Sequence, residues 1–420
     1  GAIASEITLC GGESATDYIG IQQIDDMTHY PENNVLRQIW QFLYEGVNRA
    51  NYMEENKANI DFEGKEAMYG EVYFLRAYYY FELVKFFGDV PLFTEARLTA
   101  GQAGTLTRTP KDEVYAQIEL DLQNAIASLP NSQSQVGRVN KYTAYALLGK
   151  VLLYQDKFAE AASALDNVIG VYSLVSDYGS QFLRFGENGP ESVFEIQYSN
   201  QSNWYDWGCA HCSEGNYAII MNGPRGWSGP EYAQGWSFNV PTEEFYNSFE
   251  EGDSRRDATV LDIEAFAAAT GASYTEGYDH TGYFNNKYIP RAGESGGQTE
   301  LNYLTNFRII RYSDVLLMAA EAYNRGGIDD GLAQEFLNQV RRRAFGGDDN
   351  DISASGSALT DAIWEERKFE LSLEGHRFFD LVRTGRASSL IAGFVEGKHE
   401  VFPIPQQEVD ISGLTQNAGY

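Results

Sequence analysis

The chain has little positive charge. Its 420 residues include 31 Lys and Arg against 60 Asp and Glu, which gives a formal net charge of −29. Nucleic-acid binding depends on clustered Lys and Arg that release counterions from the phosphate backbone. Anionic lipid surfaces also repel an acidic protein. The composition therefore excludes a nucleic-acid-binding protein and a protein held on a membrane by anionic lipid.

Cysteines and long apolar runs are also scarce. The three cysteines, Cys10, Cys209 and Cys212, do not make a disulfide framework, and their odd number leaves one unpaired. No apolar run approaches the roughly 18 residues that a membrane-spanning helix needs. The chain starts with Gly1, and its first residues lack the basic and apolar regions of a signal peptide. We expect the numbering to begin inside a longer precursor or at an engineered end.

Aromatic residues, in contrast, are abundant. The chain holds 6 Trp, 28 Tyr and 24 Phe, and 43% of its residues are hydrophobic. A sequence of this kind fills a large core, so we do not expect intrinsic disorder despite the charge. We predict a soluble, globular and acidic protein.

Apolar residues recur at helical spacing through the first half of the chain. The pattern predicts helices at about residues 35–56, 63–87, 110–129, 141–155 and 158–169. The last pair has Leu148 and Gly149 on one helix and Ala161 and Leu165 on the next, as in a tetratricopeptide (TPR) repeat. The small Gly149 and Ala161 let the two helices approach closely. A looser copy of the pattern lies at residues 316–340.

Residues 173–308 differ from the helical segments on either side. Gly, Asn, Ser and Tyr crowd together there with four of the six Trp, and helical periodicity is limited to short pieces such as 242–249. Long segments without regular structure are usually functional or disordered. Because the aromatic residues disfavour disorder, we predict that this insert carries function.

Motifs along nearly the whole chain resemble those of the SusD/RagB family. The most specific are RYSDVLLMAAE at 311–321 and ERKFELSLEGHRFFDL at 366–381, with FLRAYYYFELVKFFGDVPL at 74–92. Trp40, Tyr44, Asn48 and Asn51 resemble an early family helix, and PTEE at 241–244 with EGDSRR at 251–256 resembles a mid-chain motif. FPIPQ at 402–406 and QNAGY at 416–420 resemble the family's C-terminal end.

The resemblance implies an α-rich, all-α dominated SusD-like fold, in which a TPR-like helix-pair scaffold carries a loop-rich insert. We expect one domain over residues 1–420, with an N-terminal helical block at 35–172, the insert and ligand face at 173–308, and a C-terminal helical block and tail at 309–420. The sequence departs from the family at its start, where a lipidated cysteine and a first helix are not visible. Cys10 does not resemble the lipid site, so we expect the anchor and first helix to have been removed.

The resemblance also implies a function. Family members are lipid-anchored proteins on the extracellular face of the outer membrane that bind nutrients, mainly glycans, and pass them to a SusC-like TonB-dependent transporter. We expect capture of an oligosaccharide or polysaccharide, and the net charge favours a neutral one unless Arg225 or Arg291 attracts an anion. The alternatives are a peptide-binding family member, a TPR adaptor that caps the transporter without its own sugar site, and a glycoside hydrolase.

The aromatic residues of the insert are the main candidates for ligand contacts, because sugar rings stack on aromatic faces while their hydroxyls need polar partners. The alternative is that these rings form a secondary core. The resemblance adds the stretch before the first clear helix, which contains Asp17, Tyr18 and Asn33 beside its two candidates. The candidate residues are Asn203, Trp204, Tyr205, Asp206, Trp207, Asn222, Arg225, Trp227, Tyr232, Trp236, His29 and Tyr30.

No catalytic or metal site is predicted. Cys209 and Cys212 have the spacing of zinc ligands, but without a second pair they are better explained as a disulfide or free thiols. The run Asp348–Asp351 offers oxygen ligands for calcium, but it lacks the EF-hand pattern and is expected to be a solvated loop. Charged residues at 367, 370, 374, 377 and 380 have helical i,i+3 or i,i+4 spacing and are interpreted as scaffold pairs. We therefore predict a protein that is not an enzyme and has no cofactor.

Overall fold

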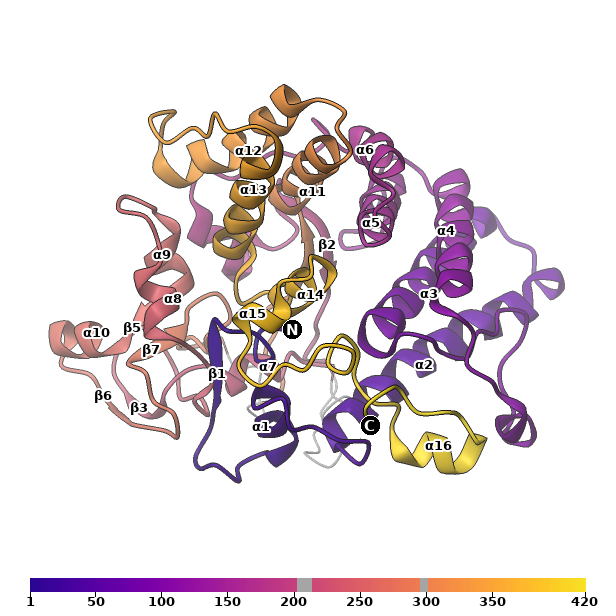
Figure 1. Cartoon of the computed structure of the whole chain (residues 1–420), viewed down its shortest axis with the longest axis horizontal. Coiled ribbons are helices and arrows are strands. Elements are labelled where there is room, and N and C mark those ends of the chain that lie inside the picture. Colours follow the sequence, from indigo (N-terminus) through magenta and orange to yellow (C-terminus); the bar gives the residue numbers. More distant parts are fainter. Residues whose placement is uncertain (202–213, 295–300) are drawn as a thin grey trace. The chain divides into compact units, whose positions relative to one another are not determined.

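The computed structural model describes residues 1–201, 214–294 and 301–420 (Figure 1). The chain divides into two compact units, each made of two segments. The helical unit comprises Thr28–Val171 and Gly393–Tyr420, and the mixed unit comprises Gly1–Met27 and Tyr172–Ala392. Among the helices of the described ranges, none combines the length and the apolar character needed to cross a membrane.

The helical unit is built from helices that follow one another along the chain, and a last short helix from the C-terminal segment. Its helices are α2 (Asn34–Glu55), α3 (Lys65–Phe87), α4 (Lys111–Ser128), α5 (Lys141–Leu153), α6 (Phe158–Asp166) and α16 (Gln406–Ser412). The boundaries predicted from periodicity agree with those of α2 to α6 to within three residues. The apolar spacing was therefore enough to locate these elements.

Close approach of α5 and α6 depends on Gly149, as the repeat pattern predicted. A Cβ atom at Gly149 would lie 2.5 Å from a side-chain carbon of Leu165 on α6. Ala161, which faces the same contact, is fully buried. Trp40 on α2 is also buried, with its ring 5.0 Å from that of Phe87 on α3. The expected helix-packing roles of these residues are confirmed.

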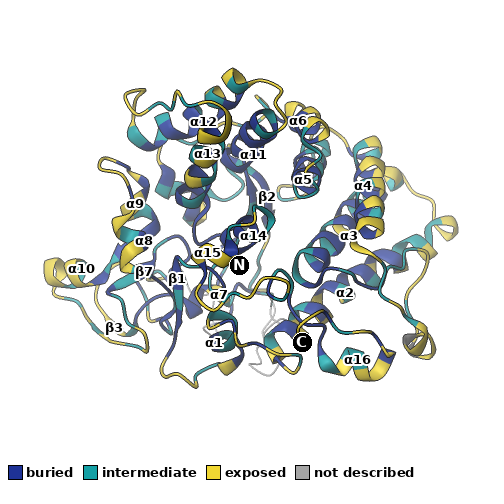
Figure 2. Cartoon of the chain, in the orientation of Figure 1, coloured by how far each residue is buried: buried dark blue, intermediate teal, exposed yellow. Residues whose placement is uncertain are grey.

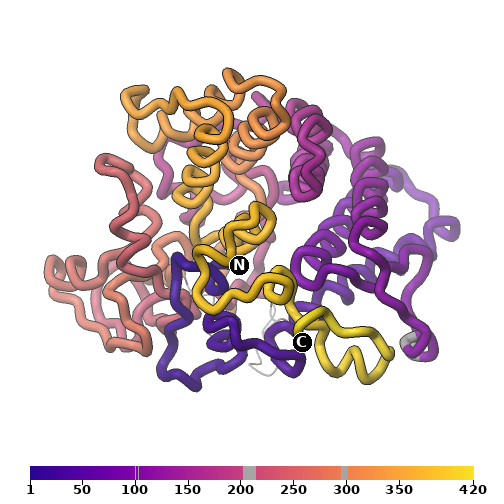
Figure 3. The backbone as a smooth tube through the Cα atoms, viewed as in Figure 1, coloured from indigo at the N-terminus to yellow at the C-terminus, as the bar shows by residue number. Residues whose placement is uncertain are grey.

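The C-terminal segment packs within the helical unit, although the sequence analysis grouped it with residues 309–392 (Figure 3). The ring of Phe402 stacks on that of Phe86 at 5.6 Å. The side-chain amide of Asn417 donates to the carbonyl oxygens of Phe87 at 3.0 Å and Phe402 at 2.7 Å. These contacts join the end of α3 to the C-terminal tail. The two segments lie far apart in the sequence, so local residue spacing did not predict their contact.

The mixed unit combines helices with short strands. Its elements are β1 (Thr8–Gly11), α1 (Ile19–Asp25), β2 (Ser192–Ile196), α7 (Ala218–Met221), β3 (Arg225–Ser228), β4 (Phe238–Pro241), α8 (Glu243–Asn247), α9 (Arg255–Thr259), β5 (Val260–Asp262), α10 (Ile263–Thr270), β6 (Ser273–Thr275), β7 (Tyr283–Asn285), β8 (Phe307–Arg311), α11 (Tyr312–Arg325), α12 (Asp330–Phe345), α13 (Gly356–Leu371), α14 (Arg377–Arg383) and α15 (Ala387–Leu390).

The strands of the described residues pair two by two in antiparallel fashion, as β1–β4, β2–β8, β3–β6 and β5–β7. The N-terminal strand β1 pairs with β4 of the insert, with Leu9 opposite Val240 and Gly11 opposite Phe238. The insert is thus held by short ladders to segments on both sides of it in the sequence.

Helices α11 and α12 form the second helix pair that the looser repeat predicted. The ring of Tyr323 on α11 lies 5.8 Å from that of Phe336 on α12. Ala319 and Ala320 are fully buried, and α11 is buried along nearly its whole length (Figure 2). The α-rich fold with TPR-like helix pairs is confirmed.

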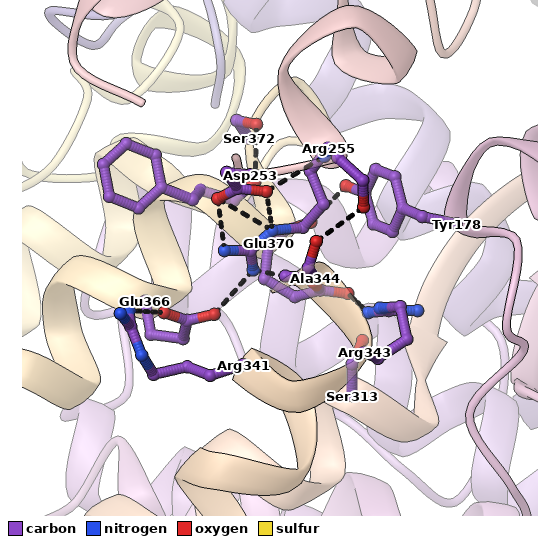
Figure 4. A network of polar contacts seen from close by, with 12 residues as sticks. Tyr178, Asp253, Arg255, Ser313, Arg341, Arg343, Ala344, Glu366, Glu370 and Ser372 are labelled. Atoms are coloured by element: carbon purple, nitrogen blue, oxygen red, sulfur yellow. Dashed lines mark hydrogen bonds and ion pairs between the residues drawn. The ribbon is translucent and has the colours of Figure 1, made fainter. Parts of the chain in front are cut away.

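A buried network of ion pairs joins α13 to the insert (Figure 4). The Glu370 carboxylate accepts from Arg255 at 3.1 Å, Arg311 at 2.8 Å and Arg343 at 2.6 Å. Burial alone would raise the pKa of Glu370, but the three guanidinium groups hold it well below its ordinary value. We call these four residues, with their bonded partners Asp253, Glu366, Glu374, Glu191, Lys287 and Arg341, the buried network.

The buried ion pairs of residues 366–381 correct one expectation. The scaffold role of the charged residues in 366–381 agrees with their burial, but their main partners are not one helical turn away. Arg367 bonds to Asp380 at 3.0 Å and to Asp314 at 2.8 Å, and Arg377 pairs with Glu6. The i,i+4 spacing predicted local pairs on a helix surface, whereas burial of these side chains directs them to partners on other elements.

Candidate functional site

Aromatic and charged side chains come together in the mixed unit beside the β1–β4 ladder. Three of the rings are partly exposed and pack on the buried cluster of Cys10, Met221 and Phe238. We call this region the candidate surface, and its members are Asp17, Tyr18, Tyr217, Arg225 and Trp236.

The turn after β1 positions the first part of this surface. Gly11 and Gly12 have φ of +73° and +106°, which L residues rarely adopt. A Cβ atom at Gly12 would lie 2.8 Å from the ring of Phe238, so the backbone passes too close to β4 for any side chain. The carboxylate of Asp17 then accepts from the backbone N–H of Glu13 at 2.8 Å. The turn therefore fixes Asp17 against the start of α1.

Arg225, the first residue of β3, forms the charged part of the surface. Its Nη2 lies 2.8 Å from Oδ2 of Asp17, and its Nη1 lies 3.7 Å from a carboxylate oxygen of Glu13. The Nε atom of Arg225 is buried without a hydrogen-bond partner in the described part of the chain. The positive charge is thus compensated by two carboxylates, while one N–H group lacks an acceptor.

The tyrosine rings supply neutral hydroxyl groups. Burial, and then the neighbouring Tyr217, raises the pKa of Tyr18 to about 12, and burial raises that of Tyr217. Tyr18 packs edge-on against Phe238 with the ring centroids 6.4 Å apart. Both phenols therefore stay protonated at neutral pH, where a hydroxyl both donates and accepts hydrogen bonds.

Four of the nine described non-glycine residues with positive φ lie around this region. Among the described non-glycine residues with positive φ, Tyr18, Ser237, Asn239 and Asp279 lie in the segments that form or border the candidate surface, with φ between +47° and +58°. Such conformations cost about 1–3 kcal/mol each and cluster at functional sites. The strain supports a functional assignment for this surface.

The structure separates Trp227 and Tyr232 from this surface. The Trp227 ring lies 6.0 Å from Tyr232 and 5.9 Å from Phe266 of α10. Tyr232 is buried in this cluster, and the guanidinium of Arg291 lies 5.4 Å from its ring centroid. Tyr232 therefore belongs to a secondary core, which was the alternative explanation, and Trp227, which is partly exposed like Trp236, packs against that core.

Three further candidates lie elsewhere. Asn222 is buried and its side-chain amide is hydrogen-bonded within the protein, with Nδ2 3.0 Å from the Tyr288 carbonyl oxygen. His29 is buried in the helical unit, where its Nε2 lies 2.8 Å from the Tyr420 hydroxyl. Tyr30, also in the helical unit, is 45% exposed. Asn222 and His29 do not reach the protein surface, so burial argues against their predicted ligand contacts.

Five candidates and the cysteine pair lie outside the described residues: Asn203, Trp204, Tyr205, Asp206, Trp207, Cys209 and Cys212. They stay predictions. The described chain on either side is joined by a hydrogen bond from the backbone N–H of Ser199 to the carbonyl oxygen of Glu214, at 3.0 Å.

Tyr217 was not among the residues predicted from the sequence. The available signal was an aromatic residue next to a polar one, Asn216, inside the insert. That combination is also present at Trp204 and at Trp236, and the predicted tyrosines of the insert, Tyr205 and Tyr232, were those that lie near a tryptophan. Residue type alone does not separate Tyr217, which is partly exposed, from Tyr232, which is buried.

Metal ligation has no support in the described ranges 1–201, 214–294 and 301–420, where no group of three or more His, Cys, Asp or Glu could hold an ion. Within the run Asp348–Asp351, the carboxylate of Asp351 is paired with Arg342 at 3.0 Å. The expectation that this run is a solvated loop without a bound cofactor stays a prediction.

Comparison with known proteins identifies the family. The "SusD family" model matches residues 190–393, and the model for "Starch-binding associating with outer membrane" matches residues 12–153. A solved laminarin-binding SusD-like protein has 37% sequence identity and a TM-score of 0.90, over 100% of this chain and 93% of that chain. The chain belongs to the SusD/RagB family.

Two further SusD-like relatives extend the comparison. Surface glycan-binding protein A from Bacteroides thetaiotaomicron, solved in complex with laminarihexaose, is 30% identical with a TM-score of 0.88, over 99% of this chain and 92% of that one. SusD-like protein P2 from Formosa agariphila is 29% identical over 95% of this chain and 83% of its own length. The predicted family is therefore confirmed, and one of its two matching models is described as associating with the outer membrane.

Proposed function

We propose that this SusD/RagB protein is a surface glycan-binding protein that captures a neutral β-1,3-glucan such as laminarin. The observation that carries the proposal is the candidate surface, where the partly exposed rings of Tyr18, Tyr217 and Trp236 adjoin the ion pair of Arg225 and Asp17. Aromatic rings offer flat faces for the C–H groups of a sugar, and the flanking hydroxyl and charged groups offer partners for its hydroxyls.

The charge distribution favours an uncharged ligand. Arg225 is compensated by Asp17 and Glu13. The guanidinium of Arg291 stacks on Tyr232 and donates to the carbonyl oxygen of Asn286 at 3.0 Å. Neither arginine is therefore an open site for a uronate or a sulfate, and the net charge of −29 repels such groups.

The choice of glycan follows from the relatives. Two similar structures bear the printed descriptions of laminarin binding and of a laminarihexaose complex. We extend the proposal to the family's setting: binding without bond cleavage, on the extracellular face of the outer membrane through an N-terminal lipid anchor, and delivery to a SusC-like TonB-dependent transporter.

Calorimetric titration with laminarihexaose tests the proposal. We expect saturable binding with a dissociation constant in the micromolar-to-millimolar range, about −8 to −4 kcal/mol, and no shortened product by chromatography. An oligogalacturonate of the same length, which carries a carboxylate on each sugar, should bind at least tenfold more weakly. Equal or tighter binding of the anionic chain would contradict the neutral-ligand assignment.

Variants test the location. Trp236→Ala should weaken laminarihexaose binding about tenfold, or roughly 1.4 kcal/mol. Trp227→Ala is the matched control, because Trp227 is a partly exposed tryptophan of the same insert that packs on a different cluster, and the variant should retain affinity once folding is verified by circular dichroism. Equal losses of affinity in both variants would show that the substitutions act by disturbing the fold of the insert. Peptide binding without any glucan binding would support the peptide-binding alternative instead.

A further inference from the structure

Tyr278 is an exposed aromatic side chain next to the candidate surface. It is 38% exposed, and it follows Gly277 in the segment between β6 and β7. Its backbone N–H donates to the carbonyl oxygen of Gly12 at 2.8 Å. The same Gly12 turn leads into Asp17, so Tyr278 and the Arg225–Asp17 pair border one turn of the backbone.

The backbone beneath this ring is tightly held. A Cβ atom at Gly277 would lie 2.6 Å from the carbonyl oxygen of Gly12 and 2.8 Å from the side chain of Ser237. Asp279, on the other side, has φ of +53°, a conformation that costs free energy for a residue with a side chain. The backbone that carries Tyr278 is therefore held in place, which reduces the backbone entropy lost when a ligand stacks on its ring.

Three carboxylates act electrostatically on the Tyr278 hydroxyl. The charge of Asp279 is the main cause of the raised pKa of the Tyr278 hydroxyl, and Asp26 and Asp25 contribute to it. Asp25 is further anchored by the backbone N–H of Cys10, which donates to its Oδ2 at 2.7 Å. An aromatic face with several acceptors beside it matches a sugar, whose hydroxyls donate hydrogen bonds.

We infer that Tyr278 is a second stacking platform for an uncharged sugar residue, with the adjacent Asp279 as an acceptor for its hydroxyls. A glucan chain held at the candidate surface then continues past the Gly11–Gly12 turn to this platform. The inference rests on the proposed function and adds a separate subsite to it. It predicts that affinity grows with chain length because a longer chain occupies both places.

A second exposed ring serves as the matched control. Phe185 is 79% exposed in the short 3-10 helix Arg184–Gly186 of the same unit. It has no contact with the β1 turn among the described interactions, so exposure is the property that it shares with Tyr278. Removing it tests whether loss of any exposed ring weakens binding.

The experiment titrates wild-type protein and the variants Tyr278→Ala, Tyr278→Phe and Phe185→Ala with laminarihexaose and with laminaritriose. We expect Tyr278→Ala to weaken hexaose binding about five- to tenfold and triose binding less than twofold. Tyr278→Phe, which keeps the ring, should stay within threefold of wild type for both ligands, and Phe185→Ala should match wild type. Unchanged thermal unfolding of Tyr278→Ala verifies its fold.

Other outcomes overturn the inference in distinguishable ways. Wild-type protein that binds neither oligosaccharide removes the proposed function, and the subsite with it. Hexaose binding that Tyr278→Ala leaves unchanged removes the subsite alone. Equal losses for triose and hexaose would make Tyr278 part of the first subsite, and equal losses in Tyr278→Ala and Tyr278→Phe would assign the effect to the hydroxyl group in place of ring stacking.

Discussion

Arginine residues pair with carboxylates in two regions of the mixed unit, and the two regions treat charge differently. In the buried network, Arg311 is 2% exposed at its side chain and contacts Glu191, Glu370 and Glu374 within 2.8 Å. At the candidate surface, Arg225 is 22% exposed and has one carboxylate, that of Asp17, within 3 Å. In the buried network, where water is excluded, each charged group has several partners of opposite charge. At the candidate surface, where a ligand is expected, the charged groups have fewer partners and reach solvent.

The pKa values of the carboxylates follow the same division. Burial alone would raise the pKa of Glu321, but Arg383 lowers it to about 2. Asp25, next to the candidate surface, has no compensating arginine, and burial raises its pKa to about 7 against the backbone hydrogen bond from Cys10. A protein with 60 acidic residues thus places its buried arginines in the scaffold and leaves carboxylates uncompensated near the surface turn.

Removing one carboxylate from the buried network should have the largest effect. Glu370→Gln leaves Arg255, Arg311 and Arg343 without their shared partner. Breaking a buried pair in this way costs about 3–5 kcal/mol, because three buried guanidinium groups each lose one of their carboxylate partners. Denaturant unfolding followed by circular dichroism measures the loss.

A control on the same helix sharpens this measurement. Glu365, which pairs with Lys368 at the surface of α13, is 49% exposed at its side chain. Glu365→Gln should change the free energy of unfolding by less than about 0.5 kcal/mol. If Glu370→Gln were no more destabilising than Glu365→Gln, the network would not be a stabilising part of the scaffold.

Part of the scaffold was predictable from the sequence. Apolar periodicity located α2 to α6, and the small residues Gly149 and Ala161 predicted a helix contact that the structure contains. These features depend on local spacing, which a single sequence records directly. The network was not predictable in the same way, because Arg255 and Glu366 meet across 111 residues of chain.

The candidate surface was only partly predictable for a related reason. The composition of the insert pointed to Arg225 and Trp236, which lie at the candidate surface, and equally to Tyr232 and Asn222, which are buried. Whether an aromatic ring becomes core or surface depends on which distant segment covers it. In this chain β1, from the N-terminus, pairs with β4 and supplies the Gly12 turn beside the site.

A substitution of Asp25 should have an intermediate effect on the free energy of unfolding, and this effect should depend on pH. The pKa of Asp25 rises from 3.8 to about 7 on folding, so between these values the folded state binds the proton more strongly than the unfolded state. Stability contributed by the neutral form is therefore present at low pH and is lost as pH rises through about 7. Asp26 and Asp279 face the same carboxyl and oppose its ionisation.

Asp25→Asn keeps an acceptor for the Cys10 N–H but cannot ionise. Relative to wild type, the variant should gain about 1–2 kcal/mol in unfolding free energy between pH 5 and pH 7.5, allowing for partial solvent screening. Paired denaturant titrations at the two pH values measure this difference. A stability difference that is the same at both pH values would show that Asp25 does not change its protonation on folding in this range.

The smallest effect is expected for the open ion pair itself. Asp17→Asn removes the charge opposite Arg225, but it retains an oxygen that accepts from the backbone N–H of Glu13. Because both side chains reach solvent, the loss in unfolding free energy should be below about 1 kcal/mol and should shrink further in 1 M salt. Titration of Asp17→Asn with laminarihexaose distinguishes a role in ligand binding from a role in the fold. A loss of binding free energy that exceeds the loss of unfolding free energy assigns the ion pair to the ligand. Equal small changes in both assign the pair to the turn. A stability loss near that of Glu370→Gln would remove the distinction between the buried network and the candidate surface.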